Sequence, residues 1–152
     1  MRSPTIVCRY ALIALIATLV TPAVAQEGHP LTGTWYGEYA EGSQKRDLTV
    51  IMKWDGRSVS GTINPGPASV AMKTVVLNIT PGKPAPEGQS STQGIPPVFH
   101  VRFEVDMPGA AGAPARGMVF EGTIENPVAG NRKIVGMWSR GSERGPFQLQ
   151  RY

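Results

Sequence analysis

The sequence predicts an all-β protein, and the favoured architecture is a small antiparallel up-and-down barrel of eight or nine strands. Apolar and polar residues alternate in short runs, which gives each predicted strand one apolar face. Turn-forming residues separate most runs by a few positions, as expected when successive strands pair antiparallel. Several runs also carry glycine on the apolar face, where it lets a strand coil tightly. A two-sheet β-sandwich is the alternative architecture.

Eight runs are strand candidates, and the turns between them set their bounds. Asp55-Gly56 predicts a tight hairpin turn, because both residues tolerate a positive φ. The predicted strands are 31–40, 47–54, 58–64, 69–80, 98–106, 116–125, 133–139 and 146–151. The run 69–80 forms either one bent strand or two short ones. Two stretches rich in Gly and Pro, 81–97 and 107–115, are expected to be irregular loops, the first a tether or a lid.

The composition is that of one folded domain with many turns. The chain has 152 residues, of which 18 are Gly and 14 are Pro, and both residue types disfavour a helical bundle. Hydrophobic residues make up 41% and charged residues 17% of the chain, which argues against a disordered polymer. The net charge of +4 is small and no basic cluster accompanies it, so the sequence gives no support for nucleic-acid binding.

Residues 1–25 are predicted to be a cleaved Sec-type signal peptide. Arg2 and Arg9 precede or border the apolar run 10–20, and Ala23-Val24-Ala25 is a small-residue cleavage site. The apolar run is shorter than the about 20 residues that span a bilayer. We therefore expect cleavage after Ala25 and a periplasmic or secreted protein with no membrane span in its mature form. The mature chain, 26–152, is expected to form a single β-barrel domain. The only cysteine, Cys8, leaves with the signal, so the mature chain has no disulfide and no thiolate ligand.

A short pattern recurs within the predicted strands: a glycine, any residue, and then a bulky apolar residue. The pattern occurs at 33–35, 61–63, 122–124 and 136–138. Glycine in a strand interior weakens the strand, so these positions are expected to serve geometry. Glycines facing inward let the wall of a small barrel bend and let a neighbouring ring lie over bare backbone.

The segment Leu31-Thr-Gly-Thr-Trp-Tyr36 resembles the opening strand of the calycin superfamily, and Gly33 and Trp35 match the Gly-x-Trp motif of lipocalins. Lipocalins also place a basic residue after the last strand, where it packs on this tryptophan. The resemblance implies a small secreted bacterial barrel in which Gly33, Trp35 and Arg151 are structural, with a cation–π contact between Arg151 and Trp35. Avidins open similarly, but Gly37 and Glu41 stand where avidins carry biotin ligands, so biotin binding is not expected.

The aromatic residues predicted to face inward are the candidate ligand-binding residues. They either pack into a filled core, as small barrels allow, or line an apolar cavity for a small molecule. The candidates are Trp35, Tyr39, Trp54, Phe103, Phe120 and Trp138. Together with the resemblance, they lead to the hypothesis of an exported lipocalin-like protein that binds a small hydrophobic molecule in or at the mouth of the barrel.

The alternative function is a non-enzymatic protein–protein interaction module or inhibitor in the cell envelope. Four apolar residues are predicted to face outward, and adjacent ones would form an exposed patch of the kind that marks partner surfaces. These residues are Ile51, Val119, Val135 and Met137. A small outer-membrane barrel is disfavoured, because the predicted strands are mostly 6–9 residues long, against about 9–11 residues for a transmembrane β-strand.

No catalytic set is recognisable in the sequence, so the protein is expected not to be an enzyme. His29 and His100 are far apart in sequence, and no metalloprotease, hydrolase, P-loop or Rossmann motif is present. Outward-facing carboxylates occur as Glu104 with Asp106 and as Glu121 with Glu125. Arg102 shares their face, so cross-strand ion pairing explains them with fewer assumptions than glycosidase chemistry does. We expect no metal and no cofactor.

Overall fold

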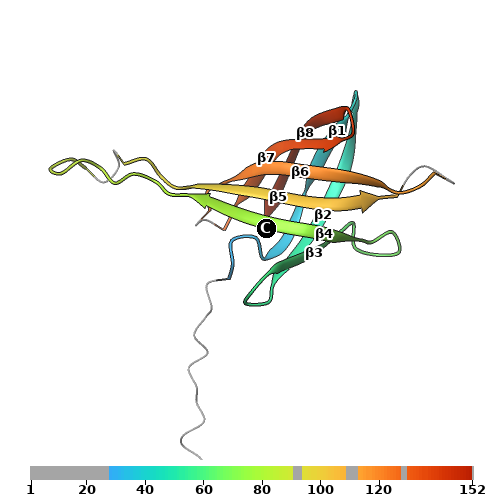
Figure 1. Cartoon of the computed structure of the whole chain (residues 1–152), viewed down its shortest axis with the longest axis horizontal. Helices are drawn as coiled ribbons and strands as arrows, with labels where there is room; N and C mark the ends of the chain where they lie inside the picture. The colour runs from blue at the N-terminus through green and yellow to red at the C-terminus, as the bar shows by residue number, and fades with distance from the viewer. Residues whose placement is uncertain (1–27, 91–93, 109–112, 128–129, 152) are drawn as a thin grey trace, which may run out of the picture.

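The protein is a closed barrel of eight antiparallel strands joined in sequence order (Figure 1). The computed structural model describes residues 28–90, 94–108, 113–127 and 130–151, so the predicted signal peptide lies outside the described residues. The strands are β1 (Gly33–Glu41), β2 (Gln44–Trp54), β3 (Val59–Ile63), β4 (Val70–Thr80), β5 (Val98–Met107), β6 (Arg116–Glu125), β7 (Lys133–Arg140) and β8 (Glu143–Arg151). The predicted all-β up-and-down barrel is confirmed, and the sandwich alternative is not the architecture formed. A closed eight-stranded barrel is also compatible with the lipocalin-like fold that the resemblance implies.

Two tight turns make strands β2 and β8 longer than the sequence predicts. Gly42 and Gly141 have φ angles of 62° and 61°, so each turn needs few residues and the strands pair up to it. β2 therefore begins at Gln44 and β8 at Glu143, both three positions before the predicted starts. β4 is a single strand, and its pairing with β5 shifts register between Met72 and Thr74.

The strand order gives the barrel two ends. The end that we call the mouth carries the β1–β2 turn, the β3–β4 loop, the β5–β6 loop and the β7–β8 turn. The end that we call the base carries the segment 28–32, the β2–β3 turn, the β4–β5 loop and the β6–β7 turn. The β4–β5 loop projects away from the barrel (Figure 1), and the bridge between Lys83 and Ile95 extends its hairpin.

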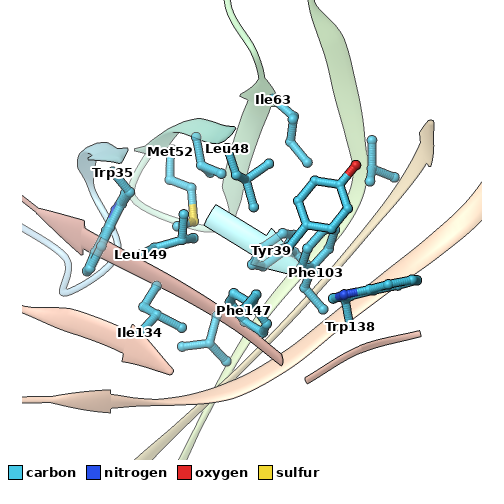
Figure 2. Packing of buried hydrophobic residues seen from close by; sticks show 14 of the residues in the cluster. Trp35, Tyr39, Leu48, Met52, Ile63, Phe103, Ile134, Trp138, Phe147 and Leu149 are labelled. Carbon is cyan, nitrogen blue, oxygen red and sulfur yellow. The ribbon is translucent and has the colours of Figure 1, made fainter. Parts of the chain in front are cut away.

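Apolar side chains fill the interior of the barrel (Figure 2). The rings of Phe103 and Phe120 stack with their centroids 4.7 Å apart, and Phe147 meets them edge-on at 6.0 and 5.1 Å. The buried residues are Leu31, Trp35, Tyr39, Leu48, Val50, Met52, Ile63, Val101, Phe103, Val105, Met118, Phe120, Ile124, Ile134, Trp138, Phe147 and Leu149. No charged side chain of the described residues is buried among them, as expected for a core stabilised by apolar burial.

The segment before β1 closes the base. Leu31 is fully buried, and its carbonyl oxygen accepts a 2.8 Å hydrogen bond from Trp35 Nε1. Arg132 donates a 3.1 Å hydrogen bond to the carbonyl oxygen of Pro30. His29 stacks on Trp54 with the ring centroids 4.5 Å apart. These contacts give the base a polar and aromatic cover over the buried Trp35.

Inward glycines let neighbouring strands approach closely. Gly122 and Gly136 lie directly opposite each other on β6 and β7. A Cβ atom at Gly136 would lie 2.0 Å from the carbonyl oxygen of Glu121, and one at Gly122 would lie 2.4 Å from that of Val135. The recurring glycine pattern therefore serves tight coiling of the wall, because the space of a side chain is taken by backbone.

Arg151 lies beside the opening strand, but its contact differs from the one that the resemblance implies. It is the register partner of Trp35 across the β1–β8 seam. Its guanidinium covers Gly33, where a Cβ atom would lie 2.7 Å from Nε. Arg151 makes no cation–π contact with the rings of the described residues, whereas Arg140 lies 5.8 Å from the ring centroid of Trp138. The predicted cation–π contact is therefore replaced by packing on glycine.

Candidate functional site

The structure places the six predicted ligand-binding aromatics in three different surroundings. Four are buried in the core and contact other apolar side chains: Trp35, Phe103, Phe120 and Trp138. Trp54 has the inward phase of its strand but lies at the base, where it is 36% exposed and covered by His29. Tyr39 lies at the opposite end of the packed rings, below the mouth, and is the one of the six that lines the hollow described next.

A hollow of about 520 Å³ opens at the mouth above Tyr39. Its wall comes from the ends of five strands and from the β5–β6 loop. It combines apolar surface with three arginines and one glutamate. The lining residues are Tyr39, Glu41, Arg46, Met107, Pro108, Ala113, Arg116 and Arg140.

Tyr39 forms the floor of this hollow. Its ring meets Phe120 and Trp138 edge-on at 6.1 and 5.7 Å, and the residue is more than nine-tenths buried. Figure 2 shows its hydroxyl directed away from Phe103 and Phe147. This hydroxyl makes no hydrogen bond to any described residue, so its donor and acceptor are available to a molecule in the hollow. Burial raises the pKa of Tyr39, with Glu41 adding to the rise, so the phenol is protonated at neutral pH.

One side of the hollow is a network of charges. Arg140 Nη2 lies 2.5 Å from Glu41 Oε1 and 2.7 Å from Glu143 Oε2, and Arg46 Nε lies 3.3 Å from Glu41 Oε2. The hydrogen bond from Arg140 holds the pKa of Glu41 below its ordinary value. Hydrogen bonds to Glu143 and Glu41 in turn raise the pKa of Arg140. Both shifts favour the ionised forms of Glu41 and Arg140 at neutral pH.

Arg116, at the start of β6, stands on the wall that β5 and β6 contribute to the hollow. Its guanidinium has no ion pair with any carboxylate of the described residues, whereas Arg46 and Arg140 share Glu41. The lining thus carries three positive charges against one negative charge. An arginine offers a planar set of donors that matches a carboxylate or a phosphate, so the hollow is chemically suited to an anionic group.

The outward apolar residues of the alternative hypothesis are partly brought together. Val135 and Met137 lie on β7 with Val119 diagonally across on β6, and Met137 pairs with Pro146 of β8. Met137 is 50% exposed. Ile51 lies on β2, and both β1 and β8 separate that strand from β7. Three of the four residues therefore share one surface, and Ile51 does not belong to it.

The remaining candidate groups form pairs on the outside of the barrel. Arg102 bridges Glu121 at 2.8 Å and also pairs with Glu104, as expected for cross-strand charges on a solvated face. Partial burial against Trp54 lowers the pKa of His29. The described residues contain no group of three His, Cys, Asp or Glu side chains placed to hold a metal ion. They also contain no helix long and apolar enough to cross a membrane.

The sequence reasoning missed the three arginines of the mouth. They occur as isolated residues at the ends of three different strands, and only the closed barrel brings them to one hollow. Comparisons of the chain with protein-family models, with curated proteins and with solved structures give no match.

Proposed function

We propose that this protein is an exported, non-enzymatic binding protein that holds a small amphipathic molecule at the mouth of the barrel. The apolar part of the ligand lies against Met107, Pro108 and the ring of Tyr39, and its anionic group lies beside Arg116 and the hydroxyl of Tyr39. One observation carries the proposal: the Tyr39 hydroxyl and the Arg116 guanidinium line the same hollow, and within the described residues the first has no hydrogen-bond partner and the second no ion pair.

The mouth supports this proposal better than the interior does. The rings of Phe103, Phe120 and Phe147 contact one another across the barrel, and the base is covered by Leu31 and its neighbours. A ligand in the interior would have to displace close-packed side chains, which costs several kcal/mol. A ligand in the mouth enters a hollow that already exists between the described residues.

The charges of the mouth favour a carboxylate or a similar anion as the head group. Hydrogen bonds to charged groups contribute about 1.5–3 kcal/mol each, so two or three of them with modest apolar burial give a Kd of order 1–100 µM. Glu41 opposes a second anion in the same space. The ligand head group is therefore expected on the Arg116 side of the hollow, away from Glu41.

A matched pair of ligands tests the proposal by calorimetry. Decanoate and decanol have the same chain and differ in the charged group, so decanoate should bind and decanol should bind at least about tenfold more weakly. Tyr39→Phe keeps the ring in the core and removes the hydroxyl, and Arg116→Gln removes the unpaired charge. Each should weaken decanoate binding by about tenfold.

The control for these variants is Arg102→Gln, which removes an arginine from the outer face of β5. Decanoate affinity should be unchanged in this variant. Absence of decanoate binding to the unmodified protein would sink the proposal, and so would equal loss of affinity in Arg102→Gln and Arg116→Gln.

A second function is favoured by the outer surface of β6 and β7. Val119, Val135 and Met137 form an apolar patch on this surface, so an interaction module that binds another envelope protein is the alternative proposal. Chemical cross-linking in the cell with and without Met137→Lys tests it. A cross-linked partner that disappears in the variant supports the alternative, and an unchanged pattern rejects this surface.

A further inference from the structure

One edge of β4 has no strand beside it over half of its length. The β3–β4 ladder consists of Thr62 with Ala71 and Ile63 with Val70, whereas β4 continues to Thr80. On its other side β4 pairs with β5 as far as Thr80. Among the described residues, no strand pairs with Thr74–Thr80 on the side of β3, and we call this segment the free β4 edge.

The free β4 edge lacks two of the features that keep exposed edges apart, and the register shift of β4 lies at its Met72–Thr74 end. Exposed edges are usually protected by charged side chains, proline or bulges that turn the edge away. The segment Thr74–Thr80 contains no charged residue and no proline. Lys73, at one end, is held by Asp106 at 3.0 Å, and Pro81 follows the other end. Val76 and Ile79 are 36% and 53% exposed, so the edge offers both backbone groups and apolar side chains.

We propose that the free β4 edge binds the same edge of a second copy of this chain, antiparallel and about a two-fold axis at Leu77. The sequence of the edge is nearly symmetric about this residue. In that register Thr74 lies opposite the partner's Thr80, and Val75 lies opposite the partner's Ile79. Threonine then pairs with threonine at both ends and Val75 pairs with Ile79 on one face, whereas Val76 lies opposite the partner's Asn78 on the other face. A two-fold contact of this kind is self-complementary and closes at two copies.

Charge and position also favour a second copy as the occupant. The two Lys73 side chains lie at opposite ends of the paired edges, so no like charges face each other. The joined β5 and β4 strands of two copies form one continuous sheet, and Phe99, which pairs with Ile79 on β5, widens its apolar face. The contact is small, so a weak dimer with a Kd in the micromolar range is expected. It uses a surface distinct from the mouth and does not depend on the proposed ligand.

Sedimentation velocity over roughly 1 to 200 µM protein tests the dimer, a range that brackets the expected Kd. The protein is expressed from the full sequence and purified in the form that the cell produces. The expected result is a concentration-dependent shift from monomer to dimer. Hydrogen exchange of the amides of Thr74–Thr80 should slow in the same concentration range, whereas the β1–β8 seam should not respond. A monomer at every concentration overturns the proposal.

Paired charge variants test the register. Val76→Lys with Asn78→Lys places lysines opposite each other in the proposed dimer, and Val76→Glu with Asn78→Glu does the same with glutamates. Each double variant alone should weaken the dimer at least about tenfold. An equal mixture of the two should restore it as a heterodimer, which a misfolded variant could not do. A dimer that persists in both double variants, or a mixture that stays monomeric, overturns the pairing.

Ser139→Lys with Gln148→Lys is the matched control. Both residues are exposed, on strands that are paired on both sides, so this double variant adds the same charge away from any free edge. The dimer should persist in it. Loss of the dimer in the control together with its persistence in the β4 variants would assign self-association to the outer surface of β7 and β8 and overturn the proposal.

Discussion

Glu41 is the residue that sets the electrostatic balance of the mouth. It accepts hydrogen bonds from Arg140 and Arg46, and so occupies donors that an anionic ligand could use. The hydroxyl of Tyr39 and the guanidinium of Arg116 have no such competitor among the described residues. The affinity of the mouth for anions is therefore limited by this one carboxylate.

Replacing Glu41 by glutamine is expected to strengthen binding of decanoate. The change removes the negative charge from the hollow and releases Arg46, while Arg140 stays paired with Glu143, so the affinity should rise by about three- to tenfold. Calorimetry at neutral pH measures the change. A fall in affinity would show that Glu41 organises the arginines for the ligand and does not compete with it.

The same carboxylate gives stability a defined pH dependence. The pKa of Glu41 is lowered in the folded protein from an ordinary value of 4.5. Its contribution to stability is therefore present above this value and is lost as the pH falls through the folded pKa. Because the ion pair is partly exposed, the contribution should be below about 1 kcal/mol.

Calorimetric melting of the unmodified protein and of Glu41→Gln between neutral pH and pH 3 measures this effect. The difference in Tm should be present at neutral pH and should vanish at the acid end. Glu125→Gln is the control, because Glu125 is exposed and forms no ion pair within the described residues. A difference that grows as the pH falls would contradict the assignment to Glu41.

The strands were predictable because alternation and turn chemistry are local properties of the sequence. The alternation in β5 and β6 predicts which of their residues face inward, and Phe103 and Phe120 are buried as expected. Local pattern cannot tell where a strand leaves the barrel. Trp54 has the correct phase but lies beyond the packed interior, and the shortness of the β3–β4 ladder depends on register with a neighbour.

The glycine positions give a prediction at the scale of the strand. Gly136→Ala would push a methyl group against the backbone of β6, so the free energy of unfolding should fall by about 1–3 kcal/mol or more. Urea unfolding measures the change. Gly117→Ala is the matched control on β6, because its new Cβ would meet only Asp106 Oδ1 at 3.6 Å. Equal stability of the two variants would contradict a role for Gly136 in coiling the barrel wall.

The whole molecule combines a filled barrel with two surfaces that are proposed to bind other molecules. These surfaces are the mouth and the free β4 edge. Filling of the interior was one of two interpretations of the sequence, because inward aromatics are compatible with a packed core and with a cavity. The mouth could not be foreseen, since Arg46, Arg116 and Arg140 are distant in sequence and meet only when β1 closes on β8. Closure of the barrel thus brings the residues of the candidate site together, whereas the local sequence pattern predicts only the strands.

The most direct measurement is a titration of the isotope-labelled protein with decanoate, followed by amide chemical shifts. Binding at the mouth predicts shifts that saturate around Tyr39 to Arg46, at Met107, Ala113 and Arg116, and at Arg140, with small changes near Leu31 and Trp35. Shifts centred on the base or spread through the packed rings would place the ligand in the interior and contradict binding at the mouth. Absence of any saturable shift would contradict the binding function itself.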